Sequence, residues 1–360
     1  MPAKHSGRPR ATVVDVFCGA GGLSHGFFRE GFDIAAGLDI DEGCRYAFEK
    51  NNDAPFIRQD VAAVDSDQIS ALFVHGRARV LVGCAPCQPF STYNQKNDDP
   101  KWRLLAKFAN LVDEIRPDVV SMENVPRLVN FRDGAVFKQF VSKLQRAGYQ
   151  VRWDILYGPD FGLAQTRSRL VLLASQLGPI EMPVPTHRRK YRTVRQEIGK
   201  LPPLKHGESD DRDPLHCASR LSPINLARIT AAKPGGTWRD WSPNLVAECH
   251  REDTGRGYSS VYGRMEWDAP APTITTQFYG FGNGRFGHPE QDRGLSLREG
   301  AMLQGFPKDY AFVAPGRPIH FKTIGKLVGN AVPVRLAQAI ASAVSSHLES
   351  IRWPRNARSR

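Results

Sequence analysis

The chain has 360 residues and a formal net charge of +12, with 49 lysines and arginines against 37 aspartates and glutamates. Its length indicates about two domains. Because 41% of its residues are hydrophobic and its mean hydropathy is -0.40, the chain can bury a sizeable core, which excludes a disordered tail protein or a fibre. The excess of positive charge favours an acidic polymer as a partner.

The sequence shows neither a membrane span nor a secretion signal. It has no run of about 18 or more apolar residues, and residues 1–10 lack the hydrophobic segment of a signal peptide. Its six cysteines are too sparse and too irregularly spaced for a disulfide framework. We therefore expect a soluble, cytoplasmic protein with reduced thiols and no membrane contact.

The first segments alternate between strand and helix. Residues 12–17 are β-branched and apolar and end at a glycine turn, residues 19–22, after which apolar residues fall at helical spacing. A second apolar run is followed by Asp39, and a third, shorter run leads to Asp60. Acidic residues thus follow the strands, at the edge where open α/β sheets bind ligands.

The alternation continues to about residue 175. Further strands are predicted at residues 80–83, 119–122, 151–156 and 170–174, and a helix with one apolar face at 104–115. This pattern is typical of a doubly wound α/β sheet with binding residues along one edge. We assign residues 1–175 to this domain.

The character of the chain changes after that point. Prolines and glycine turns become frequent, so residues 176–292 are predicted to form a smaller, loop-rich second domain. Helical patterns return near residues 296–304 and after Pro333, which suits a first helical position. We expect residues 293–350 to close the second domain and to return, through the last helix, to the sheet, so that the second domain is an insertion.

The turn at residues 19–22 is a candidate cofactor site. Glycine lets the backbone approach a cofactor closely, and an acidic residue after the second strand can accept hydrogen bonds from ribose hydroxyls. Asp39 lies 18 residues after Gly21, near the offset that such a unit requires. Nicotinamide, flavin and S-adenosylmethionine enzymes all use this unit, and a plain tight turn fits the glycines equally well.

Cys87 is the candidate nucleophile. It lies just after a buried strand, and oriented backbone amides or a nearby cation are needed to ionise a thiol at neutral pH. Cys84 and the remaining cysteines are interpreted as structural. A redox pair of Cys84 and Cys87 is disfavoured by the flanking Pro86 and Pro89, and a zinc site by the lack of a second well-spaced ligand pair, so we expect no metal.

Two further features carry polar chemistry. Glu123 ends a buried strand, where a partly desolvated carboxyl group can donate a proton to a ring nitrogen. Arg167 and Arg169 are two residues apart, hence on one side of an extended segment, where they can bind a phosphate or a carbonyl oxygen. Each feature alone is more often a structural salt bridge than a catalytic group, so only their combination supports a catalytic interpretation.

In combination these features resemble the cytosine-C5 DNA methyltransferases. Six motifs follow the family's order, at residues 15–22, 86–88, 123–125, 165–169, 298–307 and 329–333. The resemblance therefore extends from residue 12 to about residue 345. One departure is Ala85, where the family usually has a first proline in Pro-Pro-Cys-Gln, and we expect it only to loosen the loop slightly.

The resemblance implies a Rossmann-like, S-adenosylmethionine-dependent methyltransferase sheet with an inserted target-recognition domain. It also implies that Cys87 adds to C6 of cytosine while Glu123 protonates or hydrogen-bonds N3, so that C5 can take a methyl group. Arg169 would contact the cytosine O2, and Arg167 would support the site and a nearby phosphate.

The implied cofactor is S-adenosylmethionine. Phe17, Gly19 and Gly21 would lie at its amino-acid end, and Asp39 at its ribose. The residues near the adenine would be Ile40, Asp60 and Val61. Those that close over the cofactor would be Asn330 and Ala331.

The family keeps its target-recognition domain where this chain has residues 176–292, and that domain must offset the few kcal/mol that flipping a cytosine out of a duplex costs. We expect most of its aromatic residues to fill a small core and most of its arginines to touch phosphates, with a minority reading bases. The candidates are Trp238, Arg239, Trp241, Tyr258, Tyr262, Arg264, Phe278, Tyr279, Phe281, Arg285 and Phe286.

The expected substrate is double-stranded DNA. We expect the enzyme to be a monomer that is located with the nucleoid. Its genetic partner would be a restriction endonuclease, or the enzyme would be a solitary methylase. Three alternatives stay open. A tRNA cytosine-C5 methyltransferase is disfavoured by the long recognition region, and a catalytically inactive DNA-binding homologue by the presence of every candidate catalytic residue. A nicotinamide-dependent oxidoreductase rests on the glycine turn alone.

Overall fold

The computed structural model describes residues 11–90 and 99–351, and the chain divides into two compact units. The first unit comprises Met1–Tyr157, Ser168–Pro185 and Val332–Arg360, and the second comprises Gly158–Arg167 and Thr186–Ala331. The first unit is thus discontinuous in sequence, and the second is inserted into it.

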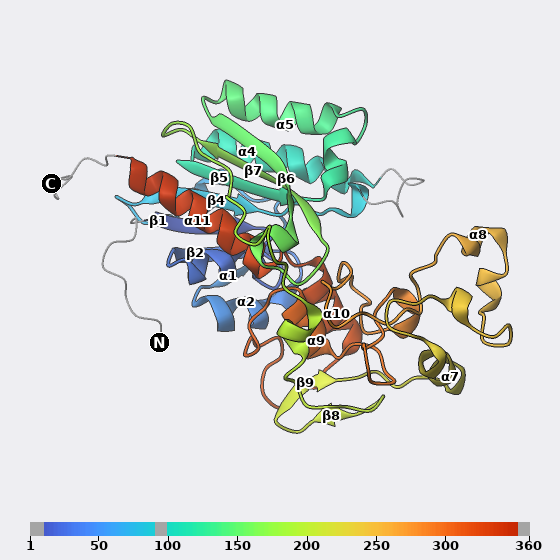
Figure 1. Ribbon diagram of the computed structural model, residues 1–360. Coiled ribbons are helices and arrows are strands. Elements are labelled where there is room, and N and C mark those ends of the chain that lie inside the picture. The colour runs from blue at the N-terminus through green and yellow to red at the C-terminus, as the bar shows by residue number, and fades with distance from the viewer. Residues whose placement is uncertain (1–10, 91–98, 352–360) are drawn as a thin grey trace. The chain divides into compact units, whose positions relative to one another are not determined.

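The described part of the first unit contains a seven-stranded sheet with the order β3-β2-β1-β4-β5-β7-β6 (Figure 1). Its strands are β1 (Ala11–Val16), β2 (Asp33–Asp39), β3 (Phe56–Arg58), β4 (Ala78–Gly83), β5 (Val119–Asn124), β6 (Gln150–Tyr157) and β7 (Ser168–Ser175). The first five strands pair in parallel, whereas β7 runs antiparallel to both β5 and β6. The predicted doubly wound α/β sheet is confirmed, with an antiparallel edge added.

Helices cover both faces of this sheet (Figure 1). They are α1 (Gly22–Arg29), α2 (Arg45–Asn52), α3 (Ser66–Ser70), α4 (Arg103–Ile115), α5 (Ala135–Arg146) and α11 (Val334–Ser350). Helices α3 to α5 bury their apolar faces in one core with β-branched and leucine residues of the strands. On the other face α11 packs on α1, because a Cβ at Gly26 would lie 2.3 Å from the Cβ of Ala337.

The last helix begins one residue later than expected. Pro333 occupies the N-cap position of α11, in an extended conformation, rather than the first helical position. Residues 321–350 have the length and hydropathy of a membrane span, but 67% of the most apolar window is buried inside the protein. Because Pro333 also separates α10 from α11, this stretch is accounted for as two core helices.

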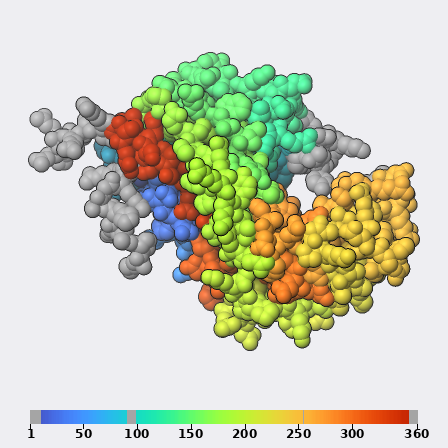
Figure 2. Space-filling view, viewed as in Figure 1, coloured from blue at the N-terminus to red at the C-terminus, as the bar shows by residue number. Residues whose placement is uncertain are grey.

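The second unit is loop-rich, as predicted. Its described helices are α6 (Val194–Ile198), α7 (Pro223–Ala231), α8 (Asp253–Arg256), α9 (Leu297–Leu303) and α10 (Phe321–Asn330), with one short hairpin of β8 (Ser209–Asp210) and β9 (Asp213–Cys217). Residues 219–262 form an arm, coloured yellow to orange in Figure 2, whose buried Trp238 and Trp241 share a small core with Phe281 from further along the chain.

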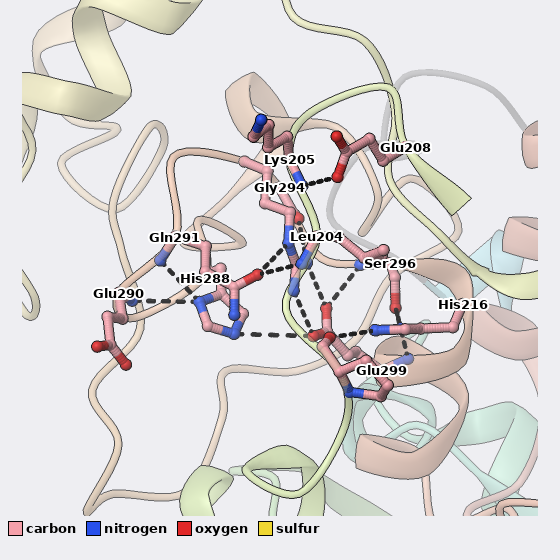
Figure 3. Close-up of polar contacts among 12 residues, drawn as sticks. Leu204, Lys205, Glu208, His216, His288, Glu290, Gln291, Gly294, Ser296 and Glu299 are labelled. Atoms are coloured by element: carbon pink, nitrogen blue, oxygen red, sulfur yellow. Dashed lines mark hydrogen bonds and ion pairs between the residues drawn. The ribbon is translucent and has the colours of Figure 1, made fainter. Parts of the chain in front are cut away.

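A buried polar cluster braces the second unit beside α9 (Figure 3). Arg293 donates to both carboxylate oxygens of Glu299 at 2.7 Å, and Glu299 also accepts from the Ser296 amide. The two ring nitrogens of His216 bond Ser296 Oγ and the Pro202 carbonyl, each at 2.8 Å. These bonds link β9, α9 and the loops between them in a part of the chain that has few regular strands.

The unit boundaries differ from the expected ones at 175, 176 and 293. Residues 158–167 belong to the second unit because the Thr166 amide and the Gln165 side chain bond residues of that unit. Residues 293–331 also stay there, since α9 packs on β9 and α6. The return to the sheet unit therefore starts at Val332, and α11 is the element that makes it.

Candidate active site

The loop that carries Cys87 follows directly from β4. It runs from Gly83 into the 3-10 helix Gln88–Phe90, whose last amide donates to the Cys87 carbonyl at 3.0 Å. The Asn124 side-chain amide, at the end of the neighbouring strand β5, donates to the Ala85 carbonyl at 2.9 Å. This bond fixes the loop at the residue that replaces the family's first proline, so the loosening expected for Ala85 is countered.

Glu123 lies at the end of β5 with only 2% of its surface exposed. Arg169 Nε lies 2.9 Å from its Oε1 as an ion pair. The antiparallel register explains the meeting, because Glu123 pairs with Val171 and Arg169 is two residues further on the same face of β7. The structure thus brings together two of the predicted catalytic side chains.

The other oxygen of Glu123 accepts a hydrogen bond from the Cys84 thiol at 2.8 Å. Gly83 pairs with Met122 in the parallel register of β4 and β5, so the next residues of the two strands meet. Burial, with the nearby Glu123 charge, raises the pKa of the Cys84 thiol well above its usual range. The cysteine interpreted as structural therefore touches the predicted acid as a protonated thiol.

The Arg167 side chain is buried and bonds backbone carbonyls. Only 5% of it is exposed, and its guanidinium donates to the carbonyls of Ile274 and Gly329 at 2.7 and 3.2 Å, all within the second unit. Arg169 makes its contacts in the first unit. Backbone carbonyls of the second unit thus occupy the Arg167 guanidinium, and the support that Arg167 is expected to give to the reaction site stays a prediction.

The Gln165 side chain joins three of the recognised motifs inside the second unit. Its amide nitrogen donates to the Leu303 carbonyl and to Gln304 Oε1, and its carbonyl oxygen accepts from the Ile274 amide. Gln304 in turn donates to the Ala331 carbonyl at 2.6 Å. These motif residues thus hold the ends of α9 and α10 together.

The glycine turn after β1 is built around Asp39. The Gly19 amide donates to Asp39 Oδ2 and the Asp41 amide to Oδ1, each at 2.9 Å. Gly19 has φ +52°, and a Cβ there would meet no atom within 4 Å, so open space lies beside the backbone. Gly21 caps α1 with φ +88°, and Phe17 adopts φ +67°, a conformation that non-glycine residues rarely take.

The residues expected near the adenine differ in exposure. Ile40 is 62% exposed, an unusual state for isoleucine that suits a stacking surface. Asp60 is also exposed, and its Oδ1 accepts from the Ala62 amide. The Val61 side chain instead lies in the main hydrophobic core, so any contact it makes with an adenine uses its backbone.

Asp15 begins the first recognised motif, but sequence reasoning gave it no role of its own. It is fully buried in β1, and Ser24 Oγ donates to its Oδ2 at 2.6 Å, whereas Oδ1 has no hydrogen-bond partner among the described residues. Burial, reinforced by the Asp39 charge, raises the pKa of Asp15 to about 7. Because Oδ1 is closed to solvent, the carboxyl group can act on a cationic group at the glycine turn only through its charge. A carboxylate inside an otherwise apolar strand was the available signal.

Asn330 and Ala331 lie at the end of α10, in the second unit. Asn330 is exposed, and the Ala331 carbonyl accepts from Gln304. Two glycines of α10 let an extended segment lie directly on this helix, because a Cβ at Gly325 or Gly329 would come within 2.4 Å of the Thr276 backbone.

The candidate recognition residues are mostly buried, and the expectation that most of the aromatic ones fill a core is confirmed. The buried aromatic members are Trp238, Trp241, Phe278, Phe281 and Phe286. Arg264 is also buried and donates to backbone carbonyls, so it has no surface for a phosphate. Tyr258 is 54% exposed and Arg239 is also exposed, so these two are the most accessible candidates.

Comparisons with known proteins agree with this geometry. The family model for C-5 cytosine-specific DNA methylases matches residues 11–346. The type II methylase M.HgiDII of Herpetosiphon aurantiacus is 50% identical over 341 residues, 94% of this chain and 96% of that protein. The type II methyltransferase M1.HphI of Haemophilus parahaemolyticus is 34% identical over 92% of this chain and 86% of that protein.

Solved structures show the same fold at lower identity. A chain described as a DNA modification methyltransferase encoded within an E. coli prophage has a TM-score of 0.74 at 20% identity, covering 94% of this chain and all of that one. The S. pombe Dnmt2 methyltransferase has a TM-score of 0.60 at 17% identity, covering 94% of this chain and 99% of that one.

The sheet and the solved structures define a Rossmann-like fold, and the family match defines a methyltransferase with that fold. The chain belongs to the C-5 cytosine-specific DNA methylase family, and it is a DNA (cytosine-5) methyltransferase of the restriction-modification type.

Proposed function

We propose that this enzyme methylates C5 of a cytosine flipped out of a specific duplex DNA sequence, with Cys87 as nucleophile, Glu123 as acid and Arg169 as the cation beside it. The observation that carries the proposal is the buried Glu123 carboxyl group, held by Arg169 at 2.9 Å and joined through Asn124 to the Cys87 loop. A nucleophile loop and a buried acid on adjacent strands match what attack on a pyrimidine ring requires.

The reaction begins when the Cys87 thiolate forms a bond to C6 of the cytosine. The electron pair of the C5–C6 double bond moves toward C5 while Glu123 gives a proton or a hydrogen bond to N3, so that C5 becomes nucleophilic. After C5 has gained the methyl group, a base removes the C5 proton. The electron pair of that C–H bond re-forms the C5–C6 double bond as the C6–sulfur bond breaks, which releases the Cys87 thiolate, and N3 returns its proton or hydrogen bond to Glu123.

The family and the fold imply S-adenosylmethionine as the methyl donor, and it supplies an electrophilic methyl group on a positively charged sulfur. Gly19, Gly21 and Phe17 would line its amino-acid end, where the charge of the buried Asp15 favours the ammonium group. Asp39 would accept from the ribose. The proposed adenine contacts are Ile40, Asp60 and the backbone of Val61, with Asn330 and Ala331 closing the site.

Arg167 is proposed as a positioning residue. Its bonds to the Ile274 and Gly329 carbonyls tie the 165–169 motif to the end of α10, and so set where Asn330 is held. The second unit is proposed to be the target-recognition domain, with Arg239 and Tyr258 as its first candidates for DNA contact.

We further propose that the enzyme acts as a monomer on duplex DNA, in the cytoplasm with the nucleoid, and that a restriction endonuclease is its genetic partner. One chain supplies every proposed reaction residue, which supports the monomer. The 50% identity to a type II methylase along nearly the whole of both chains supports DNA over tRNA as the substrate.

Methyl transfer from labelled S-adenosylmethionine to a long unmethylated duplex DNA, compared with tRNA, tests the proposal. Wild type should label the duplex, and Cys87→Ser should lose at least roughly 100-fold in rate while keeping its DNA affinity. Cys249→Ser, which removes an exposed cysteine, is the matched control and should be unchanged. Label on tRNA alone, or equal labelling by Cys87→Ser, would overturn the proposal.

A further inference from the structure

Cys84 makes a contact that the proposed mechanism does not use. Its sulfur lies 2.8 Å from Glu123 Oε2, on the opposite carboxylate oxygen from Arg169. Both partners are fixed in place, since Cys84 directly follows β4 and Glu123 ends β5. The next residue, Ala85, is anchored by Asn124. The short contact is therefore a built feature of the loop, and the thiol has little freedom to leave it.

The charges around Glu123 decide which of its oxygens carries a proton. Arg169 places a positive charge at Oε1, which disfavours a proton there. Cys84 faces Oε2, and a thiol can both donate and accept a hydrogen bond. The titratable groups that contact this carboxyl group in the described first unit are Arg169 of β7 and Cys84 of the loop. Oε2 is therefore the oxygen of Glu123 that faces a neutral group able to donate or to accept a hydrogen bond.

We propose that Cys84 is a positioning residue for Glu123: its thiol donates to Oε2 when the carboxyl group is ionised and accepts from Oε2 when it is protonated. The inference rests on the proposed role of Glu123 as acid. Burial raises the pKa of the Cys84 thiol, so it stays protonated and neutral throughout the cycle. A residue that only donates could not serve both states of the carboxyl group.

Two substitutions separate this role from simple packing. Cys84→Ser keeps a group that donates and accepts, whereas Cys84→Ala removes it at similar size. We expect Cys84→Ala to lower kcat by roughly tenfold, less than the 10²–10⁴-fold expected for loss of an acid itself, with KM for DNA and for S-adenosylmethionine within about twofold of wild type. Cys84→Ser should keep kcat within roughly threefold of wild type.

A second readout isolates the proton step. Duplex DNA carrying tritium at cytosine C5 releases label to water when the C5 hydrogen is removed, a step that requires Cys87 to have added and the ring to have been activated. This release should fall in Cys84→Ala in parallel with kcat and recover in Cys84→Ser. Cys249→Ala is the matched control for loss of a thiol, and thermal unfolding together with DNA binding should show that all variants are folded.

Wild-type kcat and tritium release in Cys84→Ala would overturn the inference. A folded Cys84→Ser variant that is as slow as Cys84→Ala would also overturn it, because the lowered kcat would then depend on the size and burial of the side chain and not on its hydrogen bonding. Cys87→Ala, measured in the same assays, keeps the two proposals distinguishable. If it stays active, the proposed function itself fails, whatever the Cys84 variants do.

Discussion

The two compact units each contain buried carboxyl groups, and these groups differ in how completely they are hydrogen-bonded. At the sheet edge of the first unit, Asp15 Oδ1 has no hydrogen-bond partner among the described residues, and Glu123 Oε1 has only the ion pair with Arg169. In the second unit, both oxygens of Glu299 are held by Arg293 and by the Ser296 amide (Figure 3). Open acceptors are costly in a core and are kept where a ligand completes them, whereas closed networks order a scaffold.

The largest effect is expected in the closed network. Arg293→Ala should destabilise the second unit by about 3–5 kcal/mol, because the buried Glu299 carboxylate loses its cation. Urea unfolding followed by hydrogen exchange of this unit measures the loss. Arg293→Met combined with Glu299→Met, which removes both charges, should recover much of the stability. A single variant as stable as wild type would show that the pair does not brace the unit.

The same network should make the second unit sensitive to acid. Burial lowers the pKa of His288 to about 4. Burial alone would raise the pKa of Glu299, but its hydrogen bonds from Arg293 bring it down to about 2. Both folded values lie below the unfolded ones, so stability is full above about pH 6.5 and falls as the pH drops through 6.5 to 4 and then toward 2.

We expect His288 to account for about 3 kcal/mol of this loss. Thermal unfolding between pH 7 and pH 4 measures it, and the matched variant His288→Gln should flatten the upper part of the profile. A wild-type profile that is flat from pH 7 to pH 4 would contradict the assignment.

Asp15, whose Oδ1 has no hydrogen-bond partner among the described residues, should lower stability while it favours cofactor binding. The pKa of Asp15 is raised to about 7, so its charged form costs stability as the pH rises through 7. Asp15→Asn should therefore stabilise the first unit by about 2 kcal/mol at pH 8, with a smaller gain at pH 5, while weakening S-adenosylhomocysteine binding. Calorimetric unfolding and titration test both. Tighter binding, or lower stability at pH 8, would refute the assignment.

The smallest effect is expected on the arm of the second unit. Tyr258 is 54% exposed, so Tyr258→Ala should change stability by less than about 0.5 kcal/mol. If it contacts DNA, affinity for the target duplex should fall by about 1 kcal/mol. Ile224→Ala, at another exposed apolar position of the arm, is the control and should leave binding unchanged. Unchanged binding by Tyr258→Ala would remove this residue from the interface.

Much of the sheet edge could be predicted from the sequence, because strand ends are local features. Apolar runs that stop at Asp39 and Glu123 were sufficient to place both residues at the carboxyl ends of parallel strands. The contact between Glu123 and Arg169 depends on an antiparallel register between segments far apart in the chain, which local patterns do not encode. The family motifs implied only that both residues act on the same cytosine.

The remaining details depend on side-chain partners that no local pattern encodes. Arg167 and Arg169 are two residues apart, yet the chain passes between the two compact units there, and their guanidiniums bond different groups. Cys84 looked inert because a lone thiol after a strand usually is. Its contact with Glu123 follows from the strand pairing of β4 with β5.

The central claim is that the Cys87 sulfur bonds transiently to C6 of the target cytosine. The most direct test incubates the enzyme with S-adenosylmethionine and a duplex that carries 5-fluorocytosine at the target position, since fluorine cannot be removed as the C5 proton is. The account predicts a denaturation-resistant enzyme–DNA adduct whose peptide map assigns the bond to Cys87, and none with Cys87→Ser. An adduct on another residue, or none with an enzyme that methylates the normal duplex, would contradict it.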